Sequence, residues 1–137
     1  MVANKVCPVV LRSYGSTAYL LAFEHPLAGY LLVKGTIEAG EAVDAAALRE
    51  LAEESGITSA NVLRSLGTWS SGFEDQVWEF ILCQPCHLLP NAWKHHALDD
   101  GGHTFRFFWH PLSADADAKL WHFVFRNALG FIRRATV

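Results

Sequence analysis

The sequence has few cysteines and no long apolar segment, and both features narrow the possible classes of protein. Its three cysteines, Cys7, Cys83 and Cys86, are too few and odd in number for a disulfide framework, which favours a reducing compartment. No apolar run reaches the roughly 18 residues that a membrane-spanning helix needs. The N-terminal apolar run is short and interrupted by Pro8 and Arg12, unlike a signal peptide. We therefore expect a cytoplasmic protein that does not bind membranes.

The sequence also lacks an excess of basic residues. Its formal net charge is −3, which argues against general nucleic-acid binding, because such proteins usually carry a strongly basic surface. The charge is unevenly distributed: residues 35–63 contain six acidic residues and one arginine, so the rest of the chain is mildly basic. An acidic segment on a mildly basic body is typical of a metal site that meets an anionic ligand.

The segment CQPCH at residues 83–87 has the spacing of a haem-attachment motif. Haem attachment of this kind normally follows export, and the sequence shows no export signal. A zinc site would need a second pair of cysteines or histidines, which only scattered histidines would supply. We expect these cysteines to be buried, or to lie at the rim of the core.

Patterns of apolar residues predict the secondary structure. Strands are predicted over residues 6–15, 17–26, 29–38 (broken at Gly35), 61–70, 75–83 and 103–112. Residues 42–55 are rich in Ala, Leu and Glu, all strong helix formers, and Gly56 follows as a C-terminal stop. Strands with helices on both sides predict an α/β (α+β) fold with a mixed β-sheet, in a single domain over residues 1–137.

The C-terminal third of the chain contains one predicted helix and one predicted loop. Residues 114–134 are expected to form an amphipathic helix, because Leu120, Phe123, Val124 and Phe131 recur at helical spacing. Residues 84–102 show little regular patterning, and connections of that length are often functional.

The predicted helix at residues 42–55 places three carboxylates where they repel one another. Glu50, Glu53 and Glu54 fall within roughly 100° of arc. The pair Glu50 and Glu54, four residues apart, costs an isolated helix about 0.2–0.5 kcal/mol, and the helix dipole also disfavours acids near the C-terminal end. Arg49 offsets only part of this charge. A bound Mg²⁺ or Mn²⁺ would resolve the conflict, and the alternative is an ordinary solvated acidic face.

Residues 35–57 resemble the Nudix box: Gly, five residues, Glu, seven residues, Arg-Glu, aliphatic, one residue, Glu-Glu, one residue, Gly, aliphatic. Every position of this pattern is met, by Gly35, Glu41, Arg49, Glu50, Leu51, Glu53, Glu54, Gly56 and Ile57. At average amino-acid usage, the seven fixed residues of this pattern would occur together by chance at on the order of one in 10⁸ starting positions. The order of strands and helices is similar to that of a whole Nudix domain, an α/β/α sandwich.

The resemblance implies an enzyme that acts on phosphoanhydride bonds, cleaving a nucleoside diphosphate linked to another moiety with Mg²⁺ or Mn²⁺ as cofactor. The implied metal ligands are Glu50, Glu53 and Glu54, with the Gly35 carbonyl and Glu41 as further or outer ligands. Arg49 would orient these carboxylates by ion pairing. The proton of the attacking water would pass to Glu50 or Glu53, or to an acid on a later loop.

Asp99 and Asp100 are the candidates for such a loop acid, although an Asp-Asp-Gly-Gly sequence is also an ordinary turn. Lys34 would contact a phosphate, because the lead-in KGTIE is similar to that of diadenosine polyphosphate hydrolases, or it would only be the polar residue at the end of a strand. Phe73 stands where many dinucleotide hydrolases have tyrosine, which argues the other way. His95 and His96 would bind phosphate or have no role in the reaction.

Arg12, Arg106 and the aromatic residues of segment 67–73 are weaker candidates for the substrate pocket, since most aromatic side chains should pack in the core. The expected substrate is a small nucleotide, either a dinucleoside polyphosphate or a nucleoside triphosphate, ahead of ADP-ribose. Two alternatives remain open: a Nudix-fold module that senses a nucleotide without cleaving it, and an RNA 5′-pyrophosphatase. The protein is expected to be a monomer or a homodimer.

Overall fold

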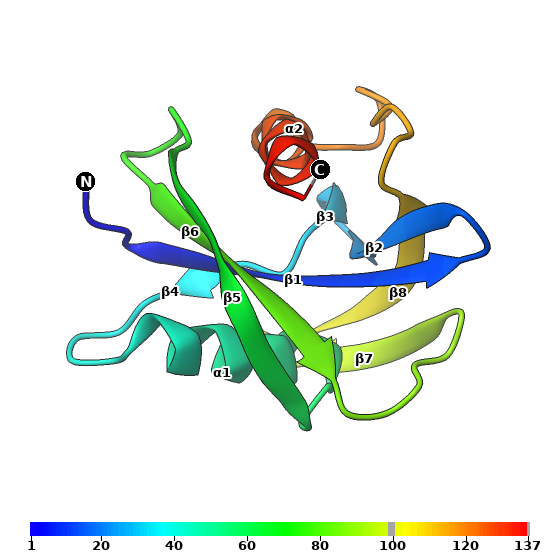
Figure 1. Cartoon of the computed structure of the whole chain (residues 1–137), viewed down its shortest axis with the longest axis horizontal. Helices are drawn as coiled ribbons and strands as arrows, with labels where there is room; N and C mark the ends of the chain where they lie inside the picture. Colours follow the sequence, from blue (N-terminus) through cyan, green and yellow to red (C-terminus); the bar gives the residue numbers. More distant parts are fainter. Residues whose placement is uncertain (99–100, 137) are drawn as a thin grey trace.

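The computed structural model describes residues 1–98 and 101–136, and in these residues it has eight strands and two helices (Figure 1). Helix α1 (Val43–Ser55) and helix α2 (Phe123–Ala135) lie on opposite sides of the strands. The predicted α/β/α sandwich, an α+β fold with a mixed sheet, is confirmed.

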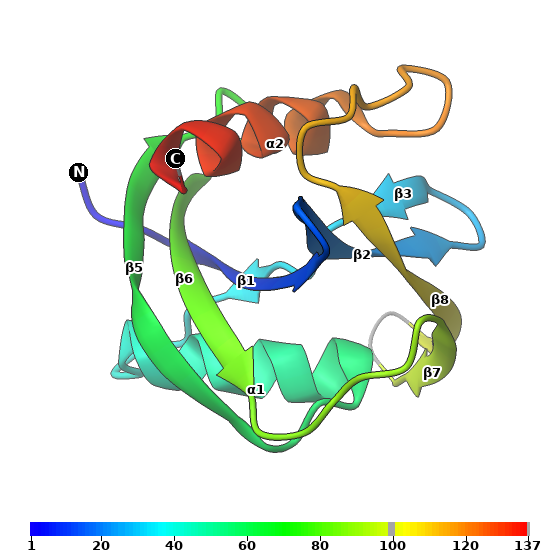
Figure 2. The same ribbon diagram turned by 45° about the vertical axis from the view of Figure 1, so that its right-hand side comes forward.

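The strands form one twisted sheet in the order β5-β6-β1-β2-β8-β7, with β3 paired to β2 and β4 paired to β1. Their bounds are β1 (Lys5–Tyr14), β2 (Thr17–His25), β3 (Gly29–Leu31), β4 (Gly35–Thr36), β5 (Ala60–Ser70), β6 (Val77–Pro85), β7 (Trp93–Ala97) and β8 (His103–Pro111). Only β1 and β6 run parallel among the pairs of named strands that the structure describes. Strand β1 pairs with β6 on one side and with β2 on the other, so it joins the half of the sheet that contains β5 and β6 to the half that contains β2, β8 and β7 (Figure 2).

A separate apolar core lies on each side of the sheet. Leu51 of α1 belongs to the first core, together with Val33, Ile81 and Phe107 of the sheet side. The second core lies under α2 and contains Trp78, Phe80, Trp121, Val124 and Leu129. Trp69, one of the aromatic candidates for the substrate pocket, packs edge-on against Trp78 with ring centroids 5.2 Å apart, so it belongs to the second core.

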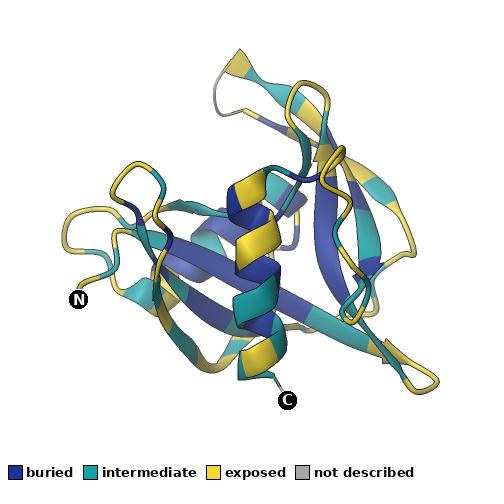
Figure 3. Cartoon of the chain, turned by 90° about the horizontal axis from the view of Figure 1, so that it is seen from above, coloured by how far each residue is buried: buried dark blue, intermediate teal, exposed yellow. Residues whose placement is uncertain are grey.

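Helix α2 begins nine residues later than predicted. Asp117 forms a turn in which its carbonyl accepts the backbone N–H groups of Leu120 and Trp121, and the Leu120 carbonyl in turn accepts the N–H of Tyr30. These residues are therefore used in a turn and a contact with β3. Two of the predicted core residues, Leu120 and Phe123, are 44% and 45% exposed. The buried stripe that is visible along α2 (Figure 3) consists of Val124, Phe125, Ala128, Leu129 and Ile132.

Two further predictions need correction. The segment 84–102 is not wholly irregular, because it contains β7, which pairs with β8. The predicted strand at 29–38 divides into β3 and β4, which pair with different neighbours, and residues 32–34 between them belong to no strand.

Of the two cysteines in the segment 83–87, Cys83 is buried, as expected, whereas Cys86 is exposed; Cys7 is buried, and all three are free thiols. Over the described residues, no helix has the length and apolar character needed to cross a membrane.

Candidate active site

Helix α1 ends where the sequence predicts, but its acidic residues do not share one exposed face. Gly56 adopts a left-handed conformation with φ of 79°, and its N–H donates to the Ala52 carbonyl. Ala46, Ala47 and Leu51 are buried in the first core. Glu50 is also buried and only 6% exposed, because its side chain turns toward the sheet and β4.

Gly35 on β4 leaves the space that the Glu50 carboxylate occupies. A Cβ atom built on Gly35 would lie 1.8 Å from Cδ of Glu50 and about as close to both carboxylate oxygens. Real Cβ atoms never approach another atom so closely. Gly35, the first glycine of the box, and Glu50, the glutamate of its Arg-Glu pair, are therefore in direct contact, although they lie 15 positions apart in the chain.

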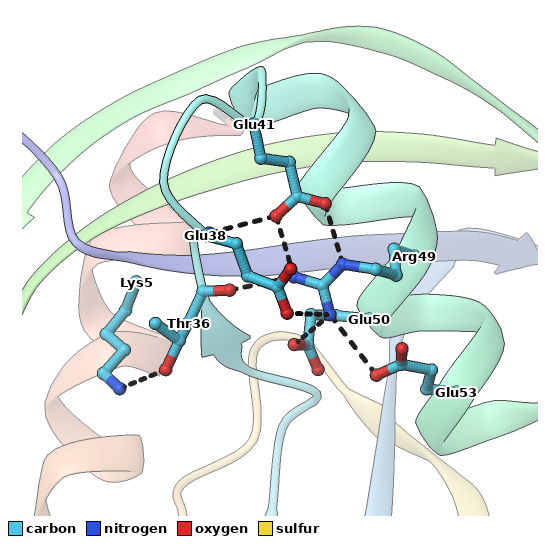
Figure 4. Close-up of polar contacts among 7 residues, drawn as sticks. All are labelled: Lys5, Thr36, Glu38, Glu41, Arg49, Glu50 and Glu53. Carbon is cyan, nitrogen blue, oxygen red and sulfur yellow. Dashed lines mark hydrogen bonds and ion pairs between the residues drawn. The ribbon is translucent and has the colours of Figure 1, made fainter.

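Arg49 connects the acidic side chains into one network (Figure 4). Its Nε and one terminal nitrogen donate to the two carboxylate oxygens of Glu41 at 2.7 and 2.8 Å. The other terminal nitrogen lies 2.9 Å from Glu50 Oε1 and 3.3 Å from Glu53 Oε2. Arg49 also donates to the Thr36 carbonyl on β4 at 2.9 Å, which ties the helix to the strand.

This network shifts the pKa values of its members. Hydrogen bonds from Arg49, together with one from the Glu38 N–H, lower the pKa of Glu41 from 4.5 to about 2. The pKa of Arg49 is raised in return, mainly by its hydrogen bonds to Glu41. Both groups are therefore charged at neutral pH, and the guanidinium is fixed in a bidentate geometry, which gives more specificity than a point charge.

A cavity of about 480 Å³ opens beside the network. Its lining residues include Gly35, Glu50 and Glu54, together with Lys5 and Lys34. Carboxylates and ammonium groups thus meet in one space. Mixed charge of this kind suits a cation bound together with an anionic ligand.

Lys34 is held among aromatic and polar groups. Its ammonium donates to Gln76 Oε1 at 3.0 Å and lies 5.1 Å from the ring centroid of Trp78. Trp78 Nε1 donates to the same Gln76 oxygen at 2.9 Å. Burial lowers the pKa of Lys34, with a further contribution from Lys5.

The lining of the cavity also contains side chains that the sequence prediction missed. Its additional lining residues include Phe23, His25, His103, Phe105 and Phe125. The rings of His25 and His103 lie 4.7 Å apart. These residues come from β2, β8 and α2, and only the pairing of distant strands brings them together. No local motif in the sequence marks them.

Among residues 1–98 and 101–136, no three His, Cys, Asp or Glu side chains are grouped in a metal-binding arrangement. Arg49 instead holds Glu41, Glu50 and Glu53. The chemistry of the donors nevertheless fits a hard divalent cation, since all are carboxylate oxygens. Glu53, with its side chain 44% exposed, has room to change rotamer.

The remaining predicted site residues lie elsewhere. Arg12 on β1 donates to the Leu89 carbonyl and to Asn91 Oδ1, and its guanidinium lies 4.1 Å from the ring centroid of Trp109. It is not among the residues that line the cavity beside Glu50. Arg106 is exposed on β8.

The loop and strand candidates after β6 have different outcomes. Asp99 and Asp100 lie outside the described residues. Phe73 packs edge-on against His122 and Phe123 and is not among the residues that line the cavity. His95 and His96 lie on β7 rather than in a loop.

Comparison with known proteins agrees with this geometry. The model of the NUDIX domain family matches residues 5–126. No curated protein matches the sequence. The structure is similar to a C. elegans Ap4A hydrolase (18% identity, 98% of this chain and 96% of that chain, TM-score 0.61). It is also similar to an ADP-ribose pyrophosphatase from Streptococcus suis (14%, 98% and 92%, TM-score 0.65) and to the Nudix hydrolase RenU from M. smegmatis (16%, 98% and 86%, TM-score 0.64).

Because the family match spans most of its length, the chain belongs to the NUDIX domain family. The predicted enzyme class, a Nudix hydrolase acting on phosphoanhydride bonds, is confirmed at the level of this family. The similar structures are all under 25% identical and add the fold to this conclusion.

Proposed function

We propose that this protein is a metal-dependent pyrophosphohydrolase that cleaves a nucleoside diphosphate linked to another moiety. The observation that carries this proposal is the cavity shared by Glu50, Glu54, Lys5 and Lys34. Carboxylates there would bind a divalent cation, while the ammonium groups would bind phosphoryl oxygens. The complete box and the family support the same reaction.

The cofactor in this proposal is Mg²⁺ or Mn²⁺, held by Glu50, Glu53 and Glu54, with the Gly35 carbonyl and Glu41 as further candidates. When bound, such an ion neutralises the charge on the phosphoryl oxygens and activates water for attack. The contribution of Arg49 is to fix Glu50 and Glu53 relative to β4 through its bonds to both carboxylates and to the Thr36 carbonyl.

A base is needed to accept the proton of the attacking water. Within the described residues, Glu50 and Glu53 are the candidates that the network positions, with Glu50 the more buried of the two. Asp99 or Asp100 would serve instead if the base lies on the loop before β8. A comparison of pH–rate profiles for Glu50→Gln and Asp99→Asn would distinguish these assignments.

For the substrate, we retain a dinucleoside polyphosphate or a nucleoside triphosphate. The volume and lining of the cavity support a nucleotide, with its phosphates bound by Lys5 and Lys34 and a flat group against His25 and His103. Aromatic and imidazole rings are suitable partners for a nucleobase. Among the similar structures, one is named an Ap4A hydrolase and another an ADP-ribose pyrophosphatase, so ADP-ribose belongs in the test.

The test is nucleotide and phosphate release from a panel of nucleoside triphosphates, oxidised triphosphates, ADP-ribose, diadenosine polyphosphates and capped RNA, with Mg²⁺ or Mn²⁺. We expect one class to be cleaved, and Glu53→Gln to lower kcat/KM at least about 100-fold, because metal charge stabilisation is worth several kcal/mol. Asp115→Asn, an exposed acid between β8 and α2, is the matched control and should retain wild-type activity.

Other outcomes would replace the proposal. Nucleotide binding without cleavage of any compound would indicate a sensing module. Cleavage of capped RNA alone would indicate an RNA 5′-pyrophosphatase. As parts of the same proposal, we place one Nudix hydrolase domain over residues 1–137, acting in the cytoplasm as a monomer or homodimer without general nucleic-acid binding.

A further inference from the structure

We propose that His95 is a positioning residue for the carboxylates at the C-terminal end of α1, acting through the helix backbone. This inference rests on the proposed metal-dependent function. His95 lies on β7, in the segment 84–102 that has no recognisable motif, and it belongs neither to the Nudix box nor to the cavity lining beside Glu50.

The contact between His95 and α1 is specific. Its Nε2 atom lies 3.0 Å from the backbone carbonyl oxygen of Glu53. A carbonyl oxygen only accepts hydrogen bonds, so Nε2 must carry the proton and donate. Trp93, two residues earlier on the same face of β7, donates from Nε1 to the Ser55 carbonyl at 2.9 Å. Two side chains of one strand thus bind two carbonyls in the last turn of the helix.

The last turn of a helix has carbonyls without partners inside the helix, and cationic side chains often satisfy them. Helix α1 has no basic residue in its last turn. His95 and Trp93 take over this function from outside the helix, which fixes the end of α1 to β7.

Gly56 shows how closely His95 fits. A Cβ atom built on Gly56 would lie 2.8 Å from Nδ1 and 3.1 Å from Cε1 of His95. The imidazole therefore occupies the space that a side chain at position 56 would need. This is a second reason for glycine there, because the positive φ of Gly56 already favours it. The ring cannot approach the Glu53 carbonyl in this way if residue 56 carries a side chain.

The carbonyl that His95 holds belongs to Glu53 itself, and Glu54 is the next residue and lines the cavity. A shift of the last turn would move both carboxylates together. Groups that orient metal ligands typically change metal affinity 10- to 100-fold when removed. His95 should therefore affect metal binding although it contacts no substrate or metal.

The experiment compares four variants of the whole chain. His95→Leu fills a similar volume without a donor, His95→Gln places an amide N–H near the position of Nε2, and His95→Ala empties the site. His96→Ala is the control, because His96 is exposed on the same strand and pairs with Thr104 Oγ1 instead. The dissociation constant of Mn²⁺ alone is measured by titration, and amide hydrogen exchange of residues 53–57 is measured without metal.

We expect His95→Leu and His95→Ala to raise the Mn²⁺ dissociation constant about 10-fold, the lower end of the range for such orienting groups, and to speed exchange at residues 53–57. His95→Gln should stay within about threefold of wild type because it restores the donor. If His95→Ala does not fold, the inference is tested by comparing the Mn²⁺ dissociation constants of His95→Leu and His95→Gln.

Several results would overturn the inference. An unchanged Mn²⁺ constant in folded His95→Leu, whether or not exchange is faster, would leave His95 a role in the fold alone. An equal effect of His96→Ala would remove the specificity. If wild type binds Mn²⁺ and Glu53→Gln abolishes this binding while His95→Leu does not, only this inference fails. If wild type binds no Mn²⁺, the proposed function fails and takes this inference with it.

Discussion

The carboxylate of Glu50 lies directly against Cα of Gly35, so closely that no side chain fits at position 35. This contact joins β4 to α1 at the point where Arg49 also binds the Thr36 carbonyl. The glycine that opens the Nudix box is thus needed for space. It lets a buried carboxylate reach the edge of the cavity, where a Cβ atom would displace it.

Gly35→Ala should lower kcat/KM about 100-fold, as expected when a reacting group is misplaced by about 1 Å. The measurements are steady-state kinetics, for kcat/KM, and the thermal midpoint of unfolding of the same variant. Gly130→Ala on α2 is the control, because its Cβ would meet the end of the Arg134 side chain at an ordinary 3.4 Å. That change should leave activity intact, and it removes a helical glycine that costs about 0.5–1 kcal/mol. Full activity in Gly35→Ala would show that Glu50 need not occupy its present position.

The pH dependence of stability should show the contribution of the ion pair between Arg49 and Glu41. The pKa of Glu41 is about 2 in the folded protein against 4.5 for the free group, so its contribution to stability is complete above pH 4.5 and is lost as the pH falls toward 2. Glu41→Gln should therefore unfold at a lower temperature than wild type at pH 7, and the difference should disappear near pH 2. The measurement is calorimetry between these limits. A difference that stays constant with pH would contradict the prediction.

Lys34 should contribute more to binding than to stability. Its pKa is lowered below 10.5 mainly by burial, so the unfolded chain binds the proton more tightly and the charged side chain opposes folding at neutral pH. Lys34→Met should keep or raise the thermal midpoint at pH 7. As the pH rises toward 10.5, the stability of the wild type should increase relative to that of the variant.

The same substitution should raise KM about 10- to 100-fold, because one charge-assisted bond to a phosphate is worth about 1.5–3 kcal/mol and each 1.4 kcal/mol is about tenfold. Lys119→Met, an exposed lysine before α2, is the control and should leave both quantities unchanged. A lower midpoint together with an unchanged KM would show that Lys34 is a structural residue.

The sequence predicted the parts of the site that are local in the chain. The spacing from Gly35 to Ile57 identified the box, and propensity placed α1 and its stop at Gly56 nearly to the residue. Alternating apolar residues identified most strands, from which the layered fold follows. The charge conflict at Glu50, Glu53 and Glu54 was also visible, although the sequence did not show that Glu50 is buried against Gly35.

What the sequence did not predict depends on contacts between distant segments. His25 and His103 meet only because β2 and β8 are neighbours. Strand β7 has no apolar alternation strong enough to mark it, and its place is set by pairing with β8. The predicted start of α2 was wrong because Asp117 forms a turn that is stabilised by a distant contact, the hydrogen bond from the Tyr30 N–H to the Leu120 carbonyl.

The central place of β1 has a consequence for how the chain folds as it is synthesised. Lys5 pairs with Trp78, and β1 continues to pair with β6 as far as Val10 and Cys83. Strand β1 is therefore synthesised about seventy residues ahead of its parallel partner β6, and long-range pairing of this kind is slow. During that interval the antiparallel pairing with β2 is already possible, since Leu11 to Tyr14 need only the adjacent strand. The nascent chain can therefore form this hairpin first, while the apolar stretch from Val6 to Val10 stays without its parallel partner until β6 has been synthesised.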